Sequence, residues 1–295
     1  MENNNLKIEI DYKKIKVYSE YNTSDIKYPL ILSIPHSGTF FPQSFLENVR
    51  FDKKNLRRNE DIFVDELVKG AIDYGLTAIK MEVTRTFIDL NRDRLELDPQ
   101  MFFNYPQGRE VLFDTHCRVG LGVVHRINYL RENIYAGLLD YHEVEERLKN
   151  VYDVYHNRLN QLIAKCIKKF GFCLVLDCHS MPNKICTIVD SRKGIDICLG
   201  NLFNQSCPQE FCDLLATQFW NNNYSVEFNC PYSGAFITFN YCQPRKMMFT
   251  LQLEINRSLY ADEITLEKGS EFYDVADDVS NAIINFAENL QRMKP

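Results

Sequence analysis

The chain has 295 residues and an ordinary globular composition, with 45% hydrophobic, 25% charged and 13% aromatic side chains. Its 34 basic and 40 acidic residues give a net charge of −6 at pH 7, without the basic excess typical of nucleic-acid-binding proteins. The N-terminus carries no apolar signal segment and no apolar run could span a bilayer, so we expect a cytoplasmic protein that binds neither nucleic acid nor membrane.

The predicted elements alternate between strands and helices along the chain. Strands are predicted over 28–35, 76–83, 172–177 and 247–253, and helices over 60–74, 211–221 and 269–293. Residues 132–169 are predicted to form two helices or one long helix. Residues 96–130, rich in Pro, Gly and aromatic side chains, follow no regular period and are expected to form a loop that shapes specificity. The alternation predicts an α/β fold. Because no linker or repeat divides the sequence, it predicts a single domain over 1–295.

Three of the predicted strands end in chemically reactive side chains. The segments are PHSG at 35–38, DCHS at 177–180 and EINR at 254–257. In open α/β sheets, ligands bind outside the carboxyl ends of the strands. These segments, which are far apart in the sequence, are therefore expected to meet at one edge of the sheet.

Two of the six histidines stand directly after predicted buried strands. These are His36 and His179. Neutral imidazole at such a position is a common zinc ligand, and its second nitrogen needs an orienting acceptor, which Asp177 could supply. Of the other histidines, His142 and His156 lie on the predicted helix 132–169 and are interpreted as structural, whereas His116 and His125 in the irregular segment are open to substrate contact.

Carboxylates could complete such a metal site. Catalytic zinc usually takes three protein ligands and leaves one position for water. Asp61, with Glu60 beside it, opens the predicted helix 60–74, although an acidic residue in a first helical turn also complements the helix dipole. Glu254 ends a buried strand and is a candidate general base, with a salt bridge to Arg257 as the structural alternative.

An arginine cluster predicts an anionic substrate. Arg85, Arg92 and Arg94 lie within ten residues of one another, with Asn91 among them. Arginine binds carboxylates through bidentate hydrogen bonds. The alternative for each arginine is structural pairing with a neighbouring carboxylate, at Asp89, Asp93 or Glu96.

Six short segments, in this order, match one known family. They are SIPHSG at 33–38, EDIFVDEL at 60–67, TRTFIDLNR at 84–92, DCHSMP at 177–182, PYSG at 231–234 and QLEINRSLY at 252–260. Over most of its length the chain resembles the N-formylglutamate amidohydrolases, which hydrolyse N-formyl-L-glutamate to formate and glutamate in histidine degradation. That family is related in fold to the zinc carboxypeptidases. The resemblance therefore implies a mixed central sheet flanked by helices on both faces.

The resemblance also implies a set of site residues and one Zn²⁺ per chain. The implied metal ligands are His36, Asp61 and His179. The implied general base is Glu254, and the implied substrate-binding residues are Arg85, Asn91 and Arg92. The implied substrate is a small anionic N-acyl amino acid. Carboxypeptidases carry a glutamate three residues after the first histidine, where this chain has Thr39, so Glu60 remains the alternative third ligand.

Other functions fit part of the same pattern. A deacylase or carboxypeptidase could use this site on another N-acyl amino acid or peptide. A catalytically silent binding protein would keep the fold without hydrolysing anything. Cys178 next to His179 suggests a cysteine-dependent hydrolase, but adjacent strand residues point to opposite faces of a sheet, which argues against that pairing. The ten cysteines contain no CxxC pair, and most are expected to be small buried side chains.

Overall fold

The computed structural model describes residues 5–6, 8–189 and 194–293, and the chain divides into two compact units. Unit 1 comprises Met1–Ser19, Pro35–Glu60 and Met81–Arg158, and unit 2 comprises Glu20–Ile34, Asp61–Lys80 and Leu159–Pro295. The assignment of residues 1–295 to a single domain stays a prediction. Among the described residues, no helix combines the length and apolarity that crossing a membrane requires.

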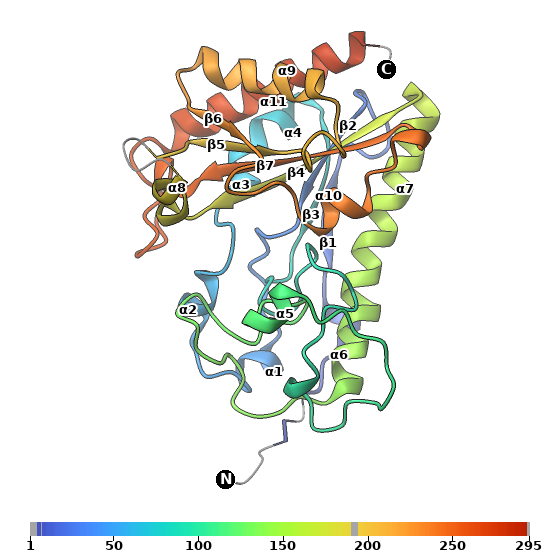
Figure 1. Ribbon diagram of the computed structural model, residues 1–295, viewed down its shortest axis with the longest axis vertical. Helices are drawn as coiled ribbons and strands as arrows, with labels where there is room; N and C mark the ends of the chain where they lie inside the picture. Colours follow the sequence, from blue (N-terminus) through green and yellow to red (C-terminus); the bar gives the residue numbers. More distant parts are fainter. Residues whose placement is uncertain (1–4, 7, 190–193, 294–295) are drawn as a thin grey trace. The chain divides into compact units, whose positions relative to one another are not determined.

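A seven-stranded mixed sheet forms the centre of unit 2, in the order β1-β3-β2-β4-β7-β5-β6 (Figure 1). The strands are β1 (Tyr18–Tyr21), β2 (Leu30–Ile34), β3 (Thr77–Met81), β4 (Cys173–Met181), β5 (Ile197–Gly200), β6 (Val226–Phe228) and β7 (Met248–Asn256). Strand β2 runs parallel to β3 and β4, and β4 runs parallel to β7. Strand β5 is antiparallel to β7 and parallel to β6. The predicted α/β class and mixed sheet are confirmed.

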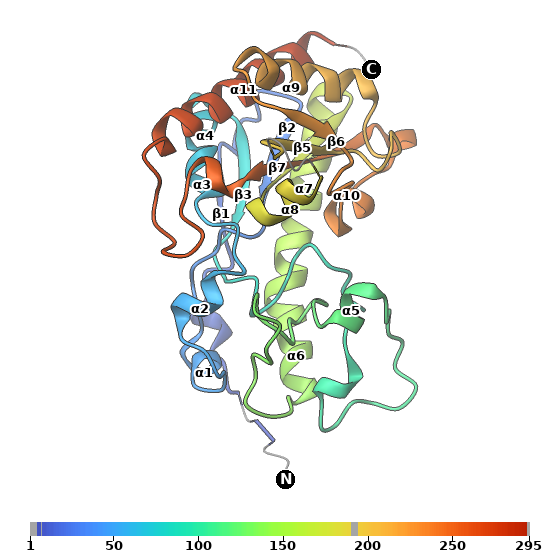
Figure 2. The same cartoon turned by 60° about the vertical axis from the view of Figure 1, so that its left-hand side comes forward.

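One face of this sheet is apolar because the strand sequences alternate with period two. In β4, Leu174, Leu176 and Cys178 enter one continuous apolar core. Four helices contribute to the same core, and they are α3 (Val64–Leu67), α4 (Lys69–Tyr74), α9 (Gln209–Asn221) and α11 (Phe272–Arg292). Figures 1 and 2 both show α9 and α11 on this side of the sheet.

The opposite face of the sheet carries the polar members of the same strands. Asp177 and His179 of β4 alternate with the core residues, and Glu254 of β7 is the register partner of His179. Helices α8 (Asn183–Val189) and α10 (Phe236–Asn240) lie on this side in both views. A small apolar cluster packs α8 against Cys198, the register partner of Glu254 on β5. Helices therefore flank both faces, as predicted.

Unit 1 contains mostly loops and short helices. Its helices are α1 (Gln43–Leu46), α2 (Lys53–Arg57), α5 (Thr115–Val119) and α6 (Tyr141–Arg147). A π-helical turn, Leu148–Tyr152, joins α6 to α7 (Asp153–Phe170), and the boundary between the units falls within α7. The predicted irregularity of 96–130 is confirmed, apart from the short α5 and a 3-10 turn at Pro99–Met101.

Two predicted helices differ from the observed ones. The predicted helix 132–169 starts only at Tyr141, because the Asp140 side chain accepts a hydrogen bond from the backbone of His142 and caps the first turn. The predicted helix 60–74 is split into α3 and α4 at Val68, which has φ −95° and ψ 3°. It ends at Gly75 as expected, with φ 121°.

The strands β4 and β7 are longer than predicted. Their ladder continues to the pair Met181 and Asn256, so His179 and Glu254 lie inside the strands and not after them. The strand prediction stopped at residues 177 and 253 because polar side chains begin there, but main-chain pairing between neighbouring strands does not depend on side-chain polarity.

Candidate functional site

In unit 2, the polar face of the sheet centres on His179, which is 2% exposed. Its Nε2 lies 2.8 Å from Asp177 Oδ2, and its Nδ1 lies 2.9 Å from Asp61 Oδ2. The Ser33 hydroxyl donates to the other oxygen of Asp177, at 3.1 Å. Asp177 is thus held as the orienting acceptor that the sequence suggested. Asp61 lies on the side of the ring where a metal would bind.

Carboxylates favour a positive charge at His179. Burial alone would lower the pKa of this imidazole, but Asp177, Asp61 and Glu254 together raise it well above its ordinary value. A metal ion between Nδ1 and Asp61 would take the place of that proton. The donor set, one imidazole nitrogen beside one carboxylate oxygen with the opposite ring nitrogen oriented, therefore fits a divalent cation such as zinc.

Glu254 is buried next to this histidine. It is 6% exposed, and its Oε1 accepts a hydrogen bond of 2.8 Å from Gln252 Nε2. The structural alternative considered for it was a salt bridge to Arg257. Instead, Arg257 lies 3.5 Å from Asp61 Oδ1 and donates to the Ser180 carbonyl at 3.4 Å. Arg257 thereby holds the second oxygen of Asp61, a role that we did not predict from the sequence.

In unit 1, a group of polar side chains surrounds Asp89, which is fully buried. Its two oxygens lie 2.7 Å from His36 Nε2, 2.9 Å from His125 Nε2 and 2.8 Å from Arg85 Nη2. Burial would raise its pKa, but Arg85, His36 and His125 hold the pKa well below the ordinary value. An ionised carboxylate only accepts hydrogen bonds, so Nε2 of His36 is the donor in its hydrogen bond to Asp89.

Asp89 therefore orients His36 in the same way as Asp177 orients His179, because each carboxylate contacts Nε2 of its histidine. From the sequence we considered Asp89 only as an arginine partner, although its place inside TRTFIDLNR was a usable signal. The loop that carries His36 is packed closely in unit 1. A Cβ added to Gly38 would lie 2.3 Å from the Val83 carbonyl oxygen, which explains the glycine in PHSG.

His125 is a second histidine on this carboxylate, and the sequence alone leaves its role open. It is 2% exposed, and burial lowers its pKa to about 4, so the ring is neutral at pH 7. With Nε2 donating to Asp89, its Nδ1 has no hydrogen-bond partner within the described residues. The irregular segment thus contributes a buried acceptor next to the Asp89 carboxylate.

The predicted substrate residues are held in different ways. Arg85 pairs with Asp89 through both Nε and Nη2, the structural pairing considered from the sequence. Arg92 is fixed by carbonyl oxygens, donating to Leu121 at 2.9 Å and to Asn91 at 2.7 Å. Asn91 is buried, and its backbone N–H donates to Asp89. Arg94 pairs instead with Asp153 and Glu145.

The alternative third ligand, Glu60, belongs to unit 1 and has its own partners there. Arg57 Nε donates to one of its oxygens at 2.9 Å, and the Thr84 hydroxyl donates to the other at 3.2 Å. Burial raises its pKa to about 7. Because Asp61 and not Glu60 contacts His179, the geometry favours Asp61 as the ligand.

The rival nucleophile Cys178 points into the apolar core, away from His179. Burial raises the pKa of its thiol well above the ordinary value, which disfavours the reactive thiolate. All ten cysteines are free, and eight of them are buried, as the sequence analysis expected for most.

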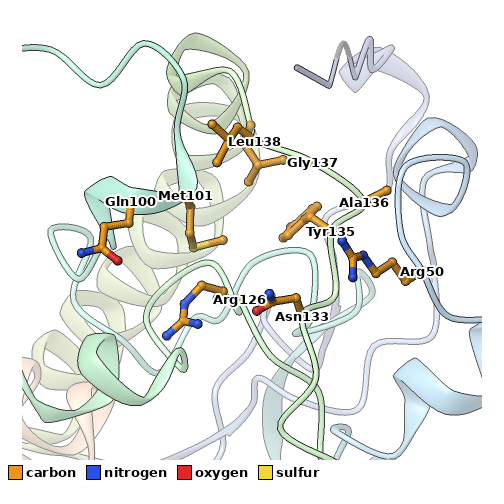
Figure 3. A pocket seen from close by; sticks show the side chains of 10 residues that line it. Arg50, Gln100, Met101, Arg126, Asn133, Tyr135, Ala136, Gly137 and Leu138 are labelled. Atoms are coloured by element: carbon orange, nitrogen blue, oxygen red, sulfur yellow. The ribbon is translucent and has the colours of Figure 1, made fainter. Parts of the chain in front are cut away.

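Unit 1 also contains a cavity of about 340 Å³ (Figure 3). Arg50 and Asn133 point toward this space. Gln100, Met101 and Arg126 from the irregular segment contribute to its wall. In the part of the chain that the structure describes, none of the predicted site residues lines this cavity.

Comparisons of sequence and of structure with known proteins identify the same family. The family model of N-formylglutamate amidohydrolase matches residues 28–261. N-formylglutamate deformylases from Pseudomonas putida and Pseudomonas aeruginosa are 25% and 26% identical to the chain, covering 80% of it and 83% and 84% of the relatives. The crystal structure of N-formylglutamate amidohydrolase from Ralstonia eutropha JMP134 has a TM-score of 0.87 at 28% identity, covering 94% of this chain and 99% of that one. A protein from Agrobacterium tumefaciens shares the fold, with a TM-score of 0.59 at 16% identity, covering 91% and 94% of the two chains.

Proposed function

The chain belongs to the N-formylglutamate amidohydrolase family and is a hydrolase of non-peptide amide bonds, and we propose that it hydrolyses N-formyl-L-glutamate with one zinc ion per chain. The observation that carries the proposal is His179, buried between Asp177 and Asp61 and paired in register with Glu254. By family resemblance we further propose that the protein acts in the cytoplasm, in histidine degradation.

The proposed metal ligands are Nδ1 of His179, a carboxylate oxygen of Asp61, and Nδ1 of His36. Support for His36 comes from chain connectivity. It follows Ile34, the last residue of β2, by two positions, and two residues span at most about 7 Å. Because β2 is hydrogen-bonded to β4, the strand of His179, the two histidines are tethered to neighbouring strands. When bound, a zinc ion polarises the amide carbonyl and lowers the pKa of water to about 7.

Glu254 carries the proton in the proposed mechanism. Its carboxylate takes a proton from the attacking water, whose oxygen forms a bond to the formyl carbon. The C–N bond then breaks, and Glu254 returns the proton to the departing amine, giving formate and glutamate. The hydrogen bond from Gln252 holds one oxygen of Glu254 in a single orientation, which suits a group that accepts and donates along one path.

Arg85, Asn91 and Arg92 are the proposed substrate-binding residues. We favour Arg92 for the carboxylate of the substrate, because its two hydrogen bonds go to neutral carbonyl oxygens and its ion pair with Glu96 is long, at 3.9 Å. Arg85 forms a close ion pair with Asp89, so it also holds the carboxylate that orients His36. Asn91 is placed between them in sequence as a neutral group for a substrate oxygen.

Metal content and formate release, measured on the same preparation, test the proposal. We expect about one zinc per chain at the site that includes His179, together with formate release from N-formyl-L-glutamate. His179→Ala should lose that zinc and the activity, and the control His142→Ala, which changes an exposed histidine, should keep both. Zinc without formate release would reject the substrate and direct the search to other N-acyl amino acids or peptides. An absence of both zinc binding and hydrolysis would point to a silent binding protein.

A further inference from the structure

A second group of side chains that could hold a metal ion lies in unit 1, next to Arg92. Glu96, Asp114 and His116 each offer one ligand atom, and these atoms all lie within 4.8 Å of one another. His116 Nδ1 is 2.8 Å from Asp114 Oδ2 and 3.9 Å from Glu96 Oε2. The three residues belong to the irregular segment 96–130, and eighteen positions separate Glu96 from Asp114 in the chain.

Glu96 provides an independent sign of a missing partner. The residue is 7% exposed, and its Oε1 accepts a hydrogen bond from the Asp93 backbone at 2.9 Å. Its Oε2 is buried, and it has no hydrogen-bond partner among the described residues. Arg92 Nε lies 3.9 Å from this oxygen, too far for a hydrogen bond. A buried carboxylate oxygen is rarely left in this state unless water or an ion completes it.

The ligand atoms lie close enough together to hold a cation, which would replace the present hydrogen bond of 2.8 Å between His116 Nδ1 and Asp114. A metal with ligand bonds of about 2.1 Å in tetrahedral geometry separates its ligand atoms by about 3.4 Å. The two distances from His116 Nδ1, 2.8 and 3.9 Å, lie on either side of that value. We propose that Glu96, Asp114 and His116 form a second divalent-cation site, selective for zinc-like ions, that is separate from the site at His179.

The surroundings of the three residues support such a role. Half of the His116 side chain is exposed, which leaves an open side for entry of the ion and for a water ligand. Two carboxylates and one imidazole suit zinc or manganese, whereas three ligands with one nitrogen are too few for calcium. Asp114 caps α5 by accepting from the Cys117 backbone, so a cation would tie the start of this helix to Glu96.

Zinc titration of the metal-free protein by equilibrium dialysis tests the proposal. We expect two equivalents of zinc per chain in the wild type. His116→Ala and Glu96→Gln should each lose one equivalent, and His142→Ala should lose none. His179→Ala should lose the other equivalent, so a failure of the proposed catalytic site is told apart from a failure of this one. Calcium at the same concentration should not compete.

The proposal is overturned if the wild type binds a single equivalent, or if the second equivalent persists in both His116→Ala and Glu96→Gln. Circular dichroism of each variant establishes that it is folded, and the half-exposed His116 can be truncated without opening the core. Formate release should persist in His116→Ala, since this variant leaves the proposed catalytic residues intact. Loss of zinc without loss of turnover is therefore the signature of an independent site.

Discussion

The two units of this chain are stabilised in different ways. Unit 2 has a parallel-rich sheet whose apolar face packs against four helices in one continuous core. Unit 1 has short helices and loops, and its buried interior contains charged and polar groups. Arg147 is fully buried there, where its Nε is 2.7 Å from Glu143 and its guanidinium lies 4.2 Å over the ring of Phe87. Asp89 is likewise fully buried.

The two interiors contribute to the protein in different ways. In unit 2, non-directional apolar burial stabilises the sheet. Main-chain pairing between β4 and β7 then places His179 and Glu254 opposite each other. Unit 1 also buries apolar side chains, but it places charged groups among them, and each buried charge needs its partners within a loop-rich segment. We therefore use charge substitution at Arg147 and pH to test the interior of unit 1, and changes in side-chain volume to test the apolar core of unit 2.

The largest expected effect is on catalysis, in unit 2. Glu254→Gln keeps the shape of the side chain and its contact with Gln252, but removes the proton acceptor. Turnover should fall by about two to four orders of magnitude, while zinc binding and the melting temperature change little. Steady-state formate release measures the change, with the exposed Glu227→Gln as the control. Wild-type turnover in Glu254→Gln would remove this residue from the mechanism.

The next largest effect is on the free energy of unfolding, which should respond to different substitutions in the interiors of the two units. Arg147→Leu leaves Glu143, whose side chain is 9% exposed, without its partner and should cost about 3–5 kcal/mol, and adding Glu143→Leu should recover much of the loss. Leu251→Ala in the core of unit 2 should cost about 2–5 kcal/mol through cavity formation, which no change of charge would recover.

The single tryptophan allows the unfolding of unit 2 to be followed separately. Trp220 lies in α9, so its fluorescence reports on unit 2, whereas circular dichroism reports on all helices. In denaturant, Arg147→Leu should shift the dichroism transition to lower concentration than the fluorescence transition. Coincident transitions in this variant would show that the units unfold together, against the view that their interiors respond separately.

A smaller effect is expected from pH. Burial lowers the pKa of His156 in unit 1 to about 4, against about 6.5 in an unfolded chain. Between these values the unfolded state binds the proton and the folded state does not, so stability is present above pH 6.5 and is lost as the pH falls toward 4. The loss from this residue is about 3 kcal/mol. His156→Gln should flatten the slope of unfolding free energy over this window, and the exposed His142→Gln should leave the slope unchanged.

The smallest effect is local to one short helix of unit 1. The Asp52 side chain accepts from the Asn55 backbone at 2.8 Å and caps α2. Asp52→Ala should lower the free energy of unfolding by about 1 kcal/mol. Asp73→Ala, which removes an exposed i,i+4 pair with Lys69, should change it by at most about 0.5 kcal/mol. Equal effects in denaturant titrations would mean that the cap contributes no more than a surface ion pair.

The sequence by itself determined the class of fold and the candidate residues of the site. Apolar runs predicted the strands, and period-two alternation in CLVLDCHSM placed Cys178 and His179 on opposite faces. These features depend on residues close in the chain, whose preferences can be read locally. The order of six short segments likewise indicated the family, which the match over residues 28–261 bears out.

Only the tertiary structure decided which polar group meets which. Asp61 contacts His179 across 118 positions, and its neighbour Glu60 pairs elsewhere. Asp89 is the partner of both His36 and His125, and the pairing of Arg257 is with Asp61 and not with Glu254. Local patterns cannot predict such contacts, because they depend on the long-range packing that excludes water. Burial makes each polar group require a partner, and the fold determines which partner lies within reach.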